Sequence, residues 1–385
     1  MSSFWAEHAW LPSGLARSVR LVVDDGRFVA VEPRAARQPN DVKLRGVVFP
    51  GLANAHSHVY QRALRGRTQS VGDNGIAWRV RMYDVADRMT PELYLALARA
   101  TFAEMALAGF TVVGEYHYLH HGPGGKPYAD RNLMGGILAQ AAAEVGIRLT
   151  LLDTLYLSGG LTSEGHLPLA GVQQRFSDGS VEAWAARAAG IEQTDLLRRG
   201  AAIHSVRSVP KEDAAYAVQL VGDRPLHVYV SEQTAENLAC QMYYGLTPTE
   251  WLADIDALGP ELTAVHATHL TERDISLLAD TECQVVVGHV LLGSCSMRGY
   301  RSGSAPTSTP SSTRSSNCVS WKCTNVWTAA SAAGSPPGSS FGAVRCMAIR
   351  VWAGTTAARS PQGCSRTSSP SIWSRPGPPA ARRPK

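Results

Sequence analysis

The sequence predicts an α/β fold, a (β/α)8 TIM-like barrel with a small β domain before it, and three observations favour this fold. The chain has 385 residues, which is enough for one barrel and a small appendage. From about residue 90 to residue 269, β-rich apolar runs alternate with helical stretches at the spacing typical of βαβ units. Polar and ionisable residues gather where the predicted strands end, and such a barrel carries its chemistry there.

The N-terminal segment predicts the small β domain. Residues 18–32 hold two β-branched runs around an Asp-Asp-Gly turn, which is the pattern of a β-hairpin. Val47-Val48-Phe49 is expected to be a buried strand that leads into P-G-L-A-N-A-H-S-H-V-Y-Q-R. We therefore expect residues 1–46 to form the N-terminal part of the small β domain and residues 47–282 to form barrel strands 1 to about 6 or 7.

Helices and strands are expected to follow one another along the barrel. Thr90-Pro91-Glu92 has the cap, the proline and the first-turn acid of a helix start, and this helix should stop at Gly109. Further helices are predicted at 132–145, 180–199, 211–220 and 247–258. Strands are predicted at 110–118, 147–156, 201–206, 225–232 and 262–269.

The composition excludes some classes of protein. No apolar run is long enough to span a membrane, and no signal peptide is visible at the N-terminus. The seven cysteines show no CxxC pair or framework spacing, which favours a reducing cytoplasm. Residues 297–385 hold 12 of the 37 Lys and Arg, and no acid follows Glu282, so the net charge of +5 arises in this C-terminal part.

A pair of histidines marks the first barrel strand. His56 and His58 lie two residues apart, so on an extended segment their side chains point to the same side. Two such imidazoles make half of a divalent-metal site. A bare HxH pair is more often structural, but the preceding strand and Pro-Gly and the following Gln61-Arg62 favour a metal site here.

Four later strand ends carry further candidate residues. These are Glu115, His117, His120 and His121, then His204 and Arg207, then His227, Tyr229 and Glu232, then His266 and His269. Each alone is more often a structural or surface group. One metal site with acid–base partners would explain their repetition at successive strand ends.

Five segments occur in order and at spacings that point to one family. They are H-S-H-x-x-Q-R, E-Y-H-Y-L-H-H, H-S-V-R-S-V-P, S-E-Q-T-A-E and V-H-A-T-H-L-T. They resemble the formimidoylglutamate deiminases of the amidohydrolase superfamily, over about residues 4–279. The resemblance implies hydrolysis of N-formimidoyl-L-glutamate to N-formyl-L-glutamate and ammonia, in histidine degradation. It also implies one divalent metal, usually zinc, and, by analogy alone, a homodimer.

The resemblance implies roles for individual residues. His56 and His58 would bind the metal, and Glu232 would carry a proton from the water to the leaving nitrogen. His266 would polarise the tetrahedral centre or hydrogen-bond the water. A guanidinium pairs well with a carboxylate, and the substrate, a small molecule with two carboxylates, would be held by Gln61, Tyr118, His204 and Arg207.

Tyr229 departs from the family pattern. That pattern is His-x-His-x-x-Glu, in which the second His is the third metal ligand, and counting back three residues from Glu232 leads to Tyr229. A neutral phenol, with a pKa near 10, is a poor zinc ligand. His227 lies about 7 Å away along the strand, which is too far to substitute. The metal site is therefore expected to lack one ligand.

The segment 283–385 departs further from the pattern. It is rich in Ser, Pro and Arg and is expected to be disordered, yet it holds four Trp, which a frameshift explains better. One base earlier, residues 297–312 can encode D-A-G-V-P-L-R-L-G-S-D-V-H-A-V-I, which restores the L-G-S-D motif that carries a metal-binding Asp in the family. We expect this chain, without its last barrel strands, to fold poorly and to be inactive.

Two other functions are alternatives. One is another deaminase of the superfamily, acting on guanine or S-adenosylhomocysteine, but E-Y-H-Y-L-H-H and H-S-V-R argue against it. The other is a nucleic-acid binder that uses the basic tail, with binding that falls steeply with salt. The tail lacks spaced aromatic residues and any nucleic-acid fold signature, so we expect neither nucleic acid nor a membrane as a partner.

Resequencing of the coding DNA from codon 220 to the stop codon tests the frameshift. We expect an inserted or missing base near codons 283–296 and a His codon at position 229, because both changes restore the family motifs. DNA that matches the present sequence would contradict a reading error and would make the gene a decayed copy.

Overall fold

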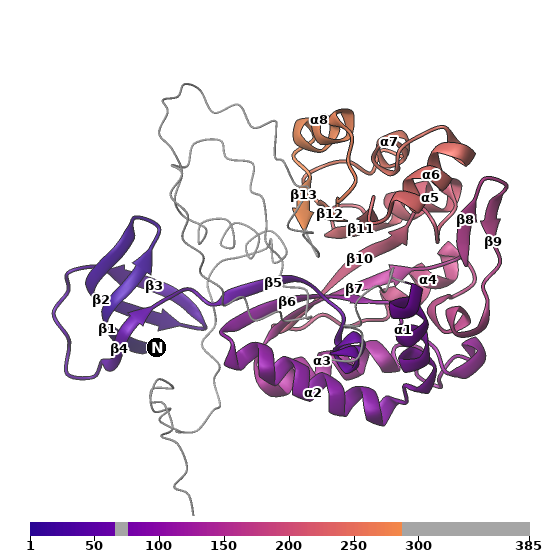
Figure 1. The fold of residues 1–385 in the computed structure, drawn as a ribbon. Helices are drawn as coiled ribbons and strands as arrows, with labels where there is room; N and C mark the ends of the chain where they lie inside the picture. The colour runs from indigo at the N-terminus through magenta and orange to yellow at the C-terminus, as the bar shows by residue number, and fades with distance from the viewer. Residues whose placement is uncertain (66–75, 287–385) are drawn as a thin grey trace, which may run out of the picture.

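The computed structural model describes residues 1–65 and 76–286 (Figure 1). Their strands form two main sheets and a separate two-stranded hairpin. The smaller sheet has the strand order β3-β2-β1-β4, and the larger has the order β13-β12-β11-β10-β7-β6-β5. The chain passes from the small sheet into the large one between β4 and β5 (Figure 1). Among the described residues, none of the helices combines the length and the apolar character needed to cross a membrane.

The small sheet contains the predicted hairpin. Its strands are β1 (Ser2–Leu11), β2 (Gly14–Asp24), β3 (Arg27–Glu32) and β4 (Val42–Val48). Asp25 and Gly26 join β2 to antiparallel β3 with φ angles of 43° and 68°, as a two-residue hairpin turn of the primed type requires. A small core of Ala6, Ala9, Val19 and Leu21 lies on one face. The predicted hairpin at residues 18–32 is confirmed.

The expected buried strand at residues 47–49 was wrong. Val47 and Val48 belong to β4 of the small sheet, and Val47 and Phe49 are 44% and 49% exposed. The first barrel strand is β5 (Leu52–Ser57), which starts after Pro50 and Gly51. β-branched residues favour a strand whether or not it is buried, so the apolar run predicted the strand but not its sheet.

The large sheet is parallel throughout and forms an incomplete barrel. Its other strands are β6 (Phe110–His117), β7 (Arg148–Leu155), β10 (Leu197–Ser205), β11 (Leu226–Val230), β12 (Leu262–His266) and β13 (Gln284–Val286). β5 and β13 are its two edges within the described residues. Figure 1 shows helices packed along the outside of these strands. The predicted α/β barrel class is confirmed.

The connections carry the helices and a few short elements. The helices are α1 (Ile76–Arg88), α2 (Pro91–Leu107), α3 (Leu133–Val145), α4 (Val181–Ala189), α5 (Lys211–Val221), α6 (Thr234–Tyr244), α7 (Pro248–Asp254) and α8 (Glu272–Asp280). The short elements are the 3-10 turns η1 (Val59–Leu64), η2 (Pro123–Gly125) and η3 (Gly171–Phe176) and the hairpin β8 (Gly160–Thr162) with β9 (Gly165–Leu167). The Thr90 hydroxyl caps α2 by accepting a hydrogen bond from the Leu93 N–H, as predicted.

Several element boundaries differ from the prediction. The helix expected at 180–199 ends at Ala189 followed by Gly190, and Leu197–Ser205 is a strand. Gly disfavours helix continuation, and the apolar run after it pairs with β7 instead. β13 lies inside the range 283–385 that the sequence assigned to the tail. The frameshift and disorder predicted for residues 287–385 lie outside the described residues.

A buried ion-pair network connects α4 to β7. The Arg187 guanidinium makes two 2.8 Å hydrogen bonds to the Asp153 carboxylate and a third, also 2.8 Å, from Nε to Asp178 Oδ1. Trp184 Nε1 donates to Asp153 at 2.9 Å. Burial is the largest single effect and opposes ionisation of Asp153, but the charge and hydrogen bonds of Arg187, together with His120 and His117, lower the pKa of Asp153 to about 2. Both carboxylates therefore depend on Arg187 for their charge balance.

The Arg187→Met substitution tests this dependence. We expect it to lower the free energy of unfolding by about 3–5 kcal/mol, because it leaves two buried carboxylates without a cation. Arg99→Met removes an exposed pair with Glu144 and should cost no more than about 1 kcal/mol. Urea unfolding at neutral pH measures both losses. Equal losses would contradict a special role for the buried network.

The same network predicts a pH dependence. The pKa of Asp153 is lower in the folded state than in the unfolded state. Ionised Asp153 therefore stabilises the folded protein fully above its unfolded pKa, about 3.9. This stabilisation is lost as the pH falls from there toward 2. The stability difference between wild type and Arg187→Met should therefore shrink over this acid range.

Candidate active site

Two histidine side chains converge at the C-terminal end of β5. His56 Nε2 and His58 Nε2 are 3.0 Å apart, and both rings are buried. His58 Nδ1 donates a 2.9 Å hydrogen bond to the Tyr116 carbonyl, which leaves the Nε2 lone pair available. Burial lowers the pKa of His58 to about 3, so its ring is neutral, as a metal ligand must be. The expectation that the two side chains share one side is confirmed.

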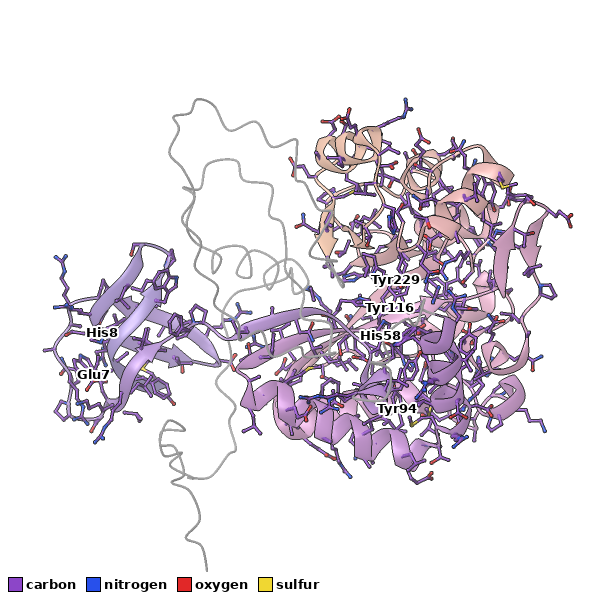
Figure 2. The ribbon with its side chains drawn as sticks, viewed as in Figure 1. Glu7, His8, His58, Tyr94, Tyr116 and Tyr229 are labelled. Carbon is purple, nitrogen blue, oxygen red and sulfur yellow. The ribbon has the colours of Figure 1, made fainter. Side chains whose placement is uncertain are left out.

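Tyr229 supplies the third group that faces this pair. Its hydroxyl hydrogen-bonds to His58 Nε2 and lies 3.4 Å from His56 Nε2. Its ring stacks on Tyr116 with a centroid distance of 4.6 Å, and Figure 2 shows His58, Tyr116 and Tyr229 close together. The His227 ring lies 6.5 Å from the His56 ring and makes no hydrogen bond to the pair.

These three groups fit a metal ion only in part. Two neutral imidazoles aimed at one point suit a divalent metal, but a catalytic zinc usually has three protein ligands. Burial raises the pKa of the Tyr229 phenol well above 10, so it keeps its proton and acts as a hydrogen-bond partner of the histidines. Within residues 1–65 and 76–286, the ligand set at this point is therefore incomplete.

Glu232 and His266 lie beside this centre, at the ends of β11 and β12. Glu232 Oε1 is 3.8 Å from His266 Nε2, and the His266 ring is 4.6 Å from the Tyr229 ring. His266 has a φ of 74°, a left-handed conformation that costs a non-glycine residue about 1–3 kcal/mol. The fold thus holds a strained histidine against a carboxylate, next to the histidine pair.

The predicted substrate residues lie around the same centre. Arg207 Nη2 is 3.2 Å from Glu232 Oε2. Gln61 Nε2 donates a 3.2 Å hydrogen bond to the Tyr118 hydroxyl, and the Tyr118 ring lies 5.3 Å from the His204 ring. The His204 ring lies in turn 5.1 Å from the Tyr229 ring. The structure therefore brings together the eight residues predicted to bind the metal, to bind the substrate or to transfer protons, and their individual roles stay predictions.

Other candidate residues serve different purposes. Glu115 Oε1 accepts the Val59 N–H, and burial raises the pKa of its carboxyl to about 8. His117, His120 and Asp153 offer donor atoms within 4.8 Å of one another. Arg187 and Trp184 already bond both Asp153 oxygens, however, so a guanidinium supplies the positive charge there. We interpret this second group as structural.

Two charged residues near the site were not predicted. Arg79 of α1 lies 3.4 Å from Gln233 Oε1, and its charge adds to burial and to Arg207 in lowering the pKa of His204. Glu236 of α6 forms an ion pair with Arg207 at 2.8 Å. Helices α1 and α6 were not predicted. Glu236 is the last residue of the segment S-E-Q-T-A-E, so the sequence marked its position without giving it a role, whereas no motif marked Arg79.

Two known protein families match parts of this sequence. Residues 47–307 match the Amidohydrolase family. Residues 1–43 match a family described as the N-terminal domain of the formimidoylglutamate deiminase HutF.

Two curated relatives and two solved structures are similar to the chain. A formimidoylglutamate deiminase of Pseudomonas aeruginosa is 35% identical over 293 residues, which are 72% of this chain and 62% of the relative. An 8-oxoguanine deaminase of the same species is 26% identical over 289 residues, which are 73% of this chain and 63% of the relative. The chain thus spans somewhat less than two thirds of the length of either relative.

The structural comparisons give the same architecture. A Brucella melitensis amidohydrolase superimposes with a TM-score of 0.68 at 34% identity, covering 73% of this chain and 63% of that one. An atrazine chlorohydrolase from Arthrobacter aurescens, solved in complex with zinc, has a TM-score of 0.62 at 19% identity, covering 76% and 66%. The second likeness shows the fold alone.

The Tyr229→His substitution tests the incomplete ligand set. We expect it to tighten Co²⁺ or Zn²⁺ binding by more than about 100-fold, because outer-shell partners alone change metal affinity by about 10–100-fold. Visible absorption of bound Co²⁺ and competition with a chelator measure the change. Tyr229→Phe, which cannot add a ligand, is the matched control. Equal affinities of the two variants would show that position 229 does not face the metal.

Proposed function

Because the chain belongs to the amidohydrolase family, we propose that its site is that of a hydrolytic deiminase acting on N-formimidoyl-L-glutamate. One observation carries this proposal: the guanidinium of Arg207 contacts Glu232, which in turn lies beside His266 and the histidine pair. A carboxylate-binding cation therefore lies next to an acid–base pair. The similarity to a formimidoylglutamate deiminase supports the choice of substrate.

In the proposed reaction, water adds to the formimidoyl carbon and the bond from that carbon to its terminal nitrogen breaks. Ammonia leaves, and N-formyl-L-glutamate remains. Glu232 takes one proton from the water as it adds and delivers it to the terminal nitrogen. It then carries the second proton, from the hydroxyl of the tetrahedral centre, to the same nitrogen as the C–N bond breaks, which is general acid–base catalysis by one carboxylate. His266, 3.8 Å from Glu232, donates a hydrogen bond to the oxygen of the tetrahedral centre.

In the proposed complex, Arg207 and Arg79 provide the positive charges that bind the carboxylates of the substrate. Arg207 is 18% exposed, so its Nη groups can reach a ligand and pair with a carboxylate in bidentate fashion. Arg79 supplies a second positive charge close to His204. The Gln61 amide and the Tyr118 hydroxyl add uncharged hydrogen-bonding groups. This combination suits a small dicarboxylate better than a purine base.

Tyr229 limits the activity of this chain. The described residues do not complete a zinc site, so we derive no catalytic step through a metal here. We propose that the chain keeps the substrate-binding groups of a deiminase while its hydrolytic rate is strongly reduced. Any zinc-dependent deiminase rate of the unmodified chain that equals the rate of Tyr229→His would contradict this proposal.

Ligand binding tests the substrate class. Isothermal titration should show that N-formimidoyl-L-glutamate binds and that 8-oxoguanine and S-adenosylhomocysteine do not. Arg207→Met should weaken binding by at least about 30-fold, because it removes one partner of a charge-assisted pair. Arg88→Met, on an exposed ion pair at the end of α1, should leave the affinity unchanged. Preferred binding of a purine would overturn the assignment in favour of a purine deaminase.

A further inference from the structure

Glu236 is a buried carboxylate to which the proposed reaction gives no role. It lies in the first turn of α6, and its side chain has 0% exposure. Its Oε2 atom lies 2.8 Å from Arg207 Nε, in an ion pair whose geometry is not that of a linear hydrogen bond. Its Oε1 atom accepts a 3.2 Å hydrogen bond from the Ser231 N–H. One carboxylate therefore touches both the guanidinium and the backbone before Glu232.

The contact with Arg207 restricts the orientation of the guanidinium. A guanidinium is planar and presents its N–H groups in a fixed fork. Glu236 faces the Nε edge from the buried side, while Nη2 points toward Glu232 Oε2 at 3.2 Å. This contact at the Nε edge restricts rotation of the guanidinium plane, and a substrate carboxylate would bind at the Nη edge, where Nη2 also donates to Glu232 Oε2.

The contact with Ser231 restricts the turn that carries Glu232. Ser231 has a φ of 51°, a left-handed conformation that a residue with a side chain rarely adopts without support. Its carbonyl accepts hydrogen bonds from the N–H groups of Thr268 and His269, in the loop after β12. Glu236 therefore stabilises a turn that also joins the loop following His266.

We propose that Glu236 is a positioning residue, which sets the spacing between the substrate-carboxylate anchor Arg207 and the proton carrier Glu232. This inference rests on the proposed function, since it assumes that Arg207 binds a carboxylate of the substrate. The charge of Glu236 also matters. Without it, Arg207 would be balanced by Glu232 alone, and Glu232 would be held by the guanidinium instead of serving the reaction.

The Glu236→Gln variant tests the role of this charge, because an amide of the same shape can still accept from Ser231. Asp274→Asn is the matched control. Asp274 is a buried carboxylate in the first turn of α8 that accepts from the Thr271 N–H at 2.8 Å and does not touch Arg207. Both variants are expected to lower the urea midpoint of unfolding.

Two measurements separate positioning from a structural role. Isothermal titration with N-formimidoyl-L-glutamate should show a loss of about 10-fold to 100-fold for Glu236→Gln only, by analogy with the loss caused by removing outer-shell partners of metal ligands. The side-chain Nε–H resonance of Arg207, assigned by its absence in Arg207→Met, should shift and exchange faster in Glu236→Gln only. Equal losses of affinity in the two variants, or an unchanged Arg207 resonance, would overturn the inference.

The resonance also separates this inference from the proposed function. If the unmodified chain does not bind N-formimidoyl-L-glutamate, the proposed function fails, whereas the Arg207 signal still reports whether Glu236 holds the guanidinium. Should Glu236→Gln not fold, Glu236→Asp keeps the charge but shortens the side chain. We expect it to weaken binding while Arg207 Nε–H stays protected, and loss of that protection would count against the inference.

Discussion

Parallel pairing of the strands in the large sheet is the constraint on which the site depends. Because β5, β10, β11 and β12 run in one direction, the residues at their C-terminal ends lie together at the same end of the barrel. His56, His204, Tyr229 and His266 come from these four strands and have ring centroids within 4.6–6.3 Å of a neighbouring ring of the set. No local feature of the chain could bring these side chains together without that alignment.

The two buried ion-pair networks, one around Arg187 and one around Arg207, differ in whether their guanidinium can reach a ligand. Between α4 and β7, Arg187 neutralises Asp153 and Asp178. His121 pairs with Asp178, and His117 and His120 lie beside Asp153. At the site, Arg207 lies between Glu232 and Glu236 and remains partly exposed. The first guanidinium has all its donors engaged within the protein, and the second retains an edge that a ligand can use.

The phenol of Tyr229 changes what the histidine pair can do. Its hydroxyl faces both imidazoles and hydrogen-bonds to His58. The histidines therefore have a stable neutral arrangement within the protein, which competes with metal binding. Gln61 and Tyr118 contact each other through a hydrogen bond that does not involve Tyr229, whereas the His204 ring lies 5.1 Å from the Tyr229 ring.

The sequence by itself determined the fold class, the hairpin at residues 18–32 and the capped helix after Thr90, and it predicted which histidines, Glu232 and Arg207 would lie at the strand ends. Periodicity, capping residues and short motifs are local, and they act through the chain nearest to them. Only the tertiary structure decided that Val47 belongs to the small sheet, that Leu197 starts a strand and that His117 and His120 face an ion-pair network away from the site. It also decided the contacts of Arg79 with Gln233 and of Glu236 with Arg207, because these contacts depend on how helices pack on strands.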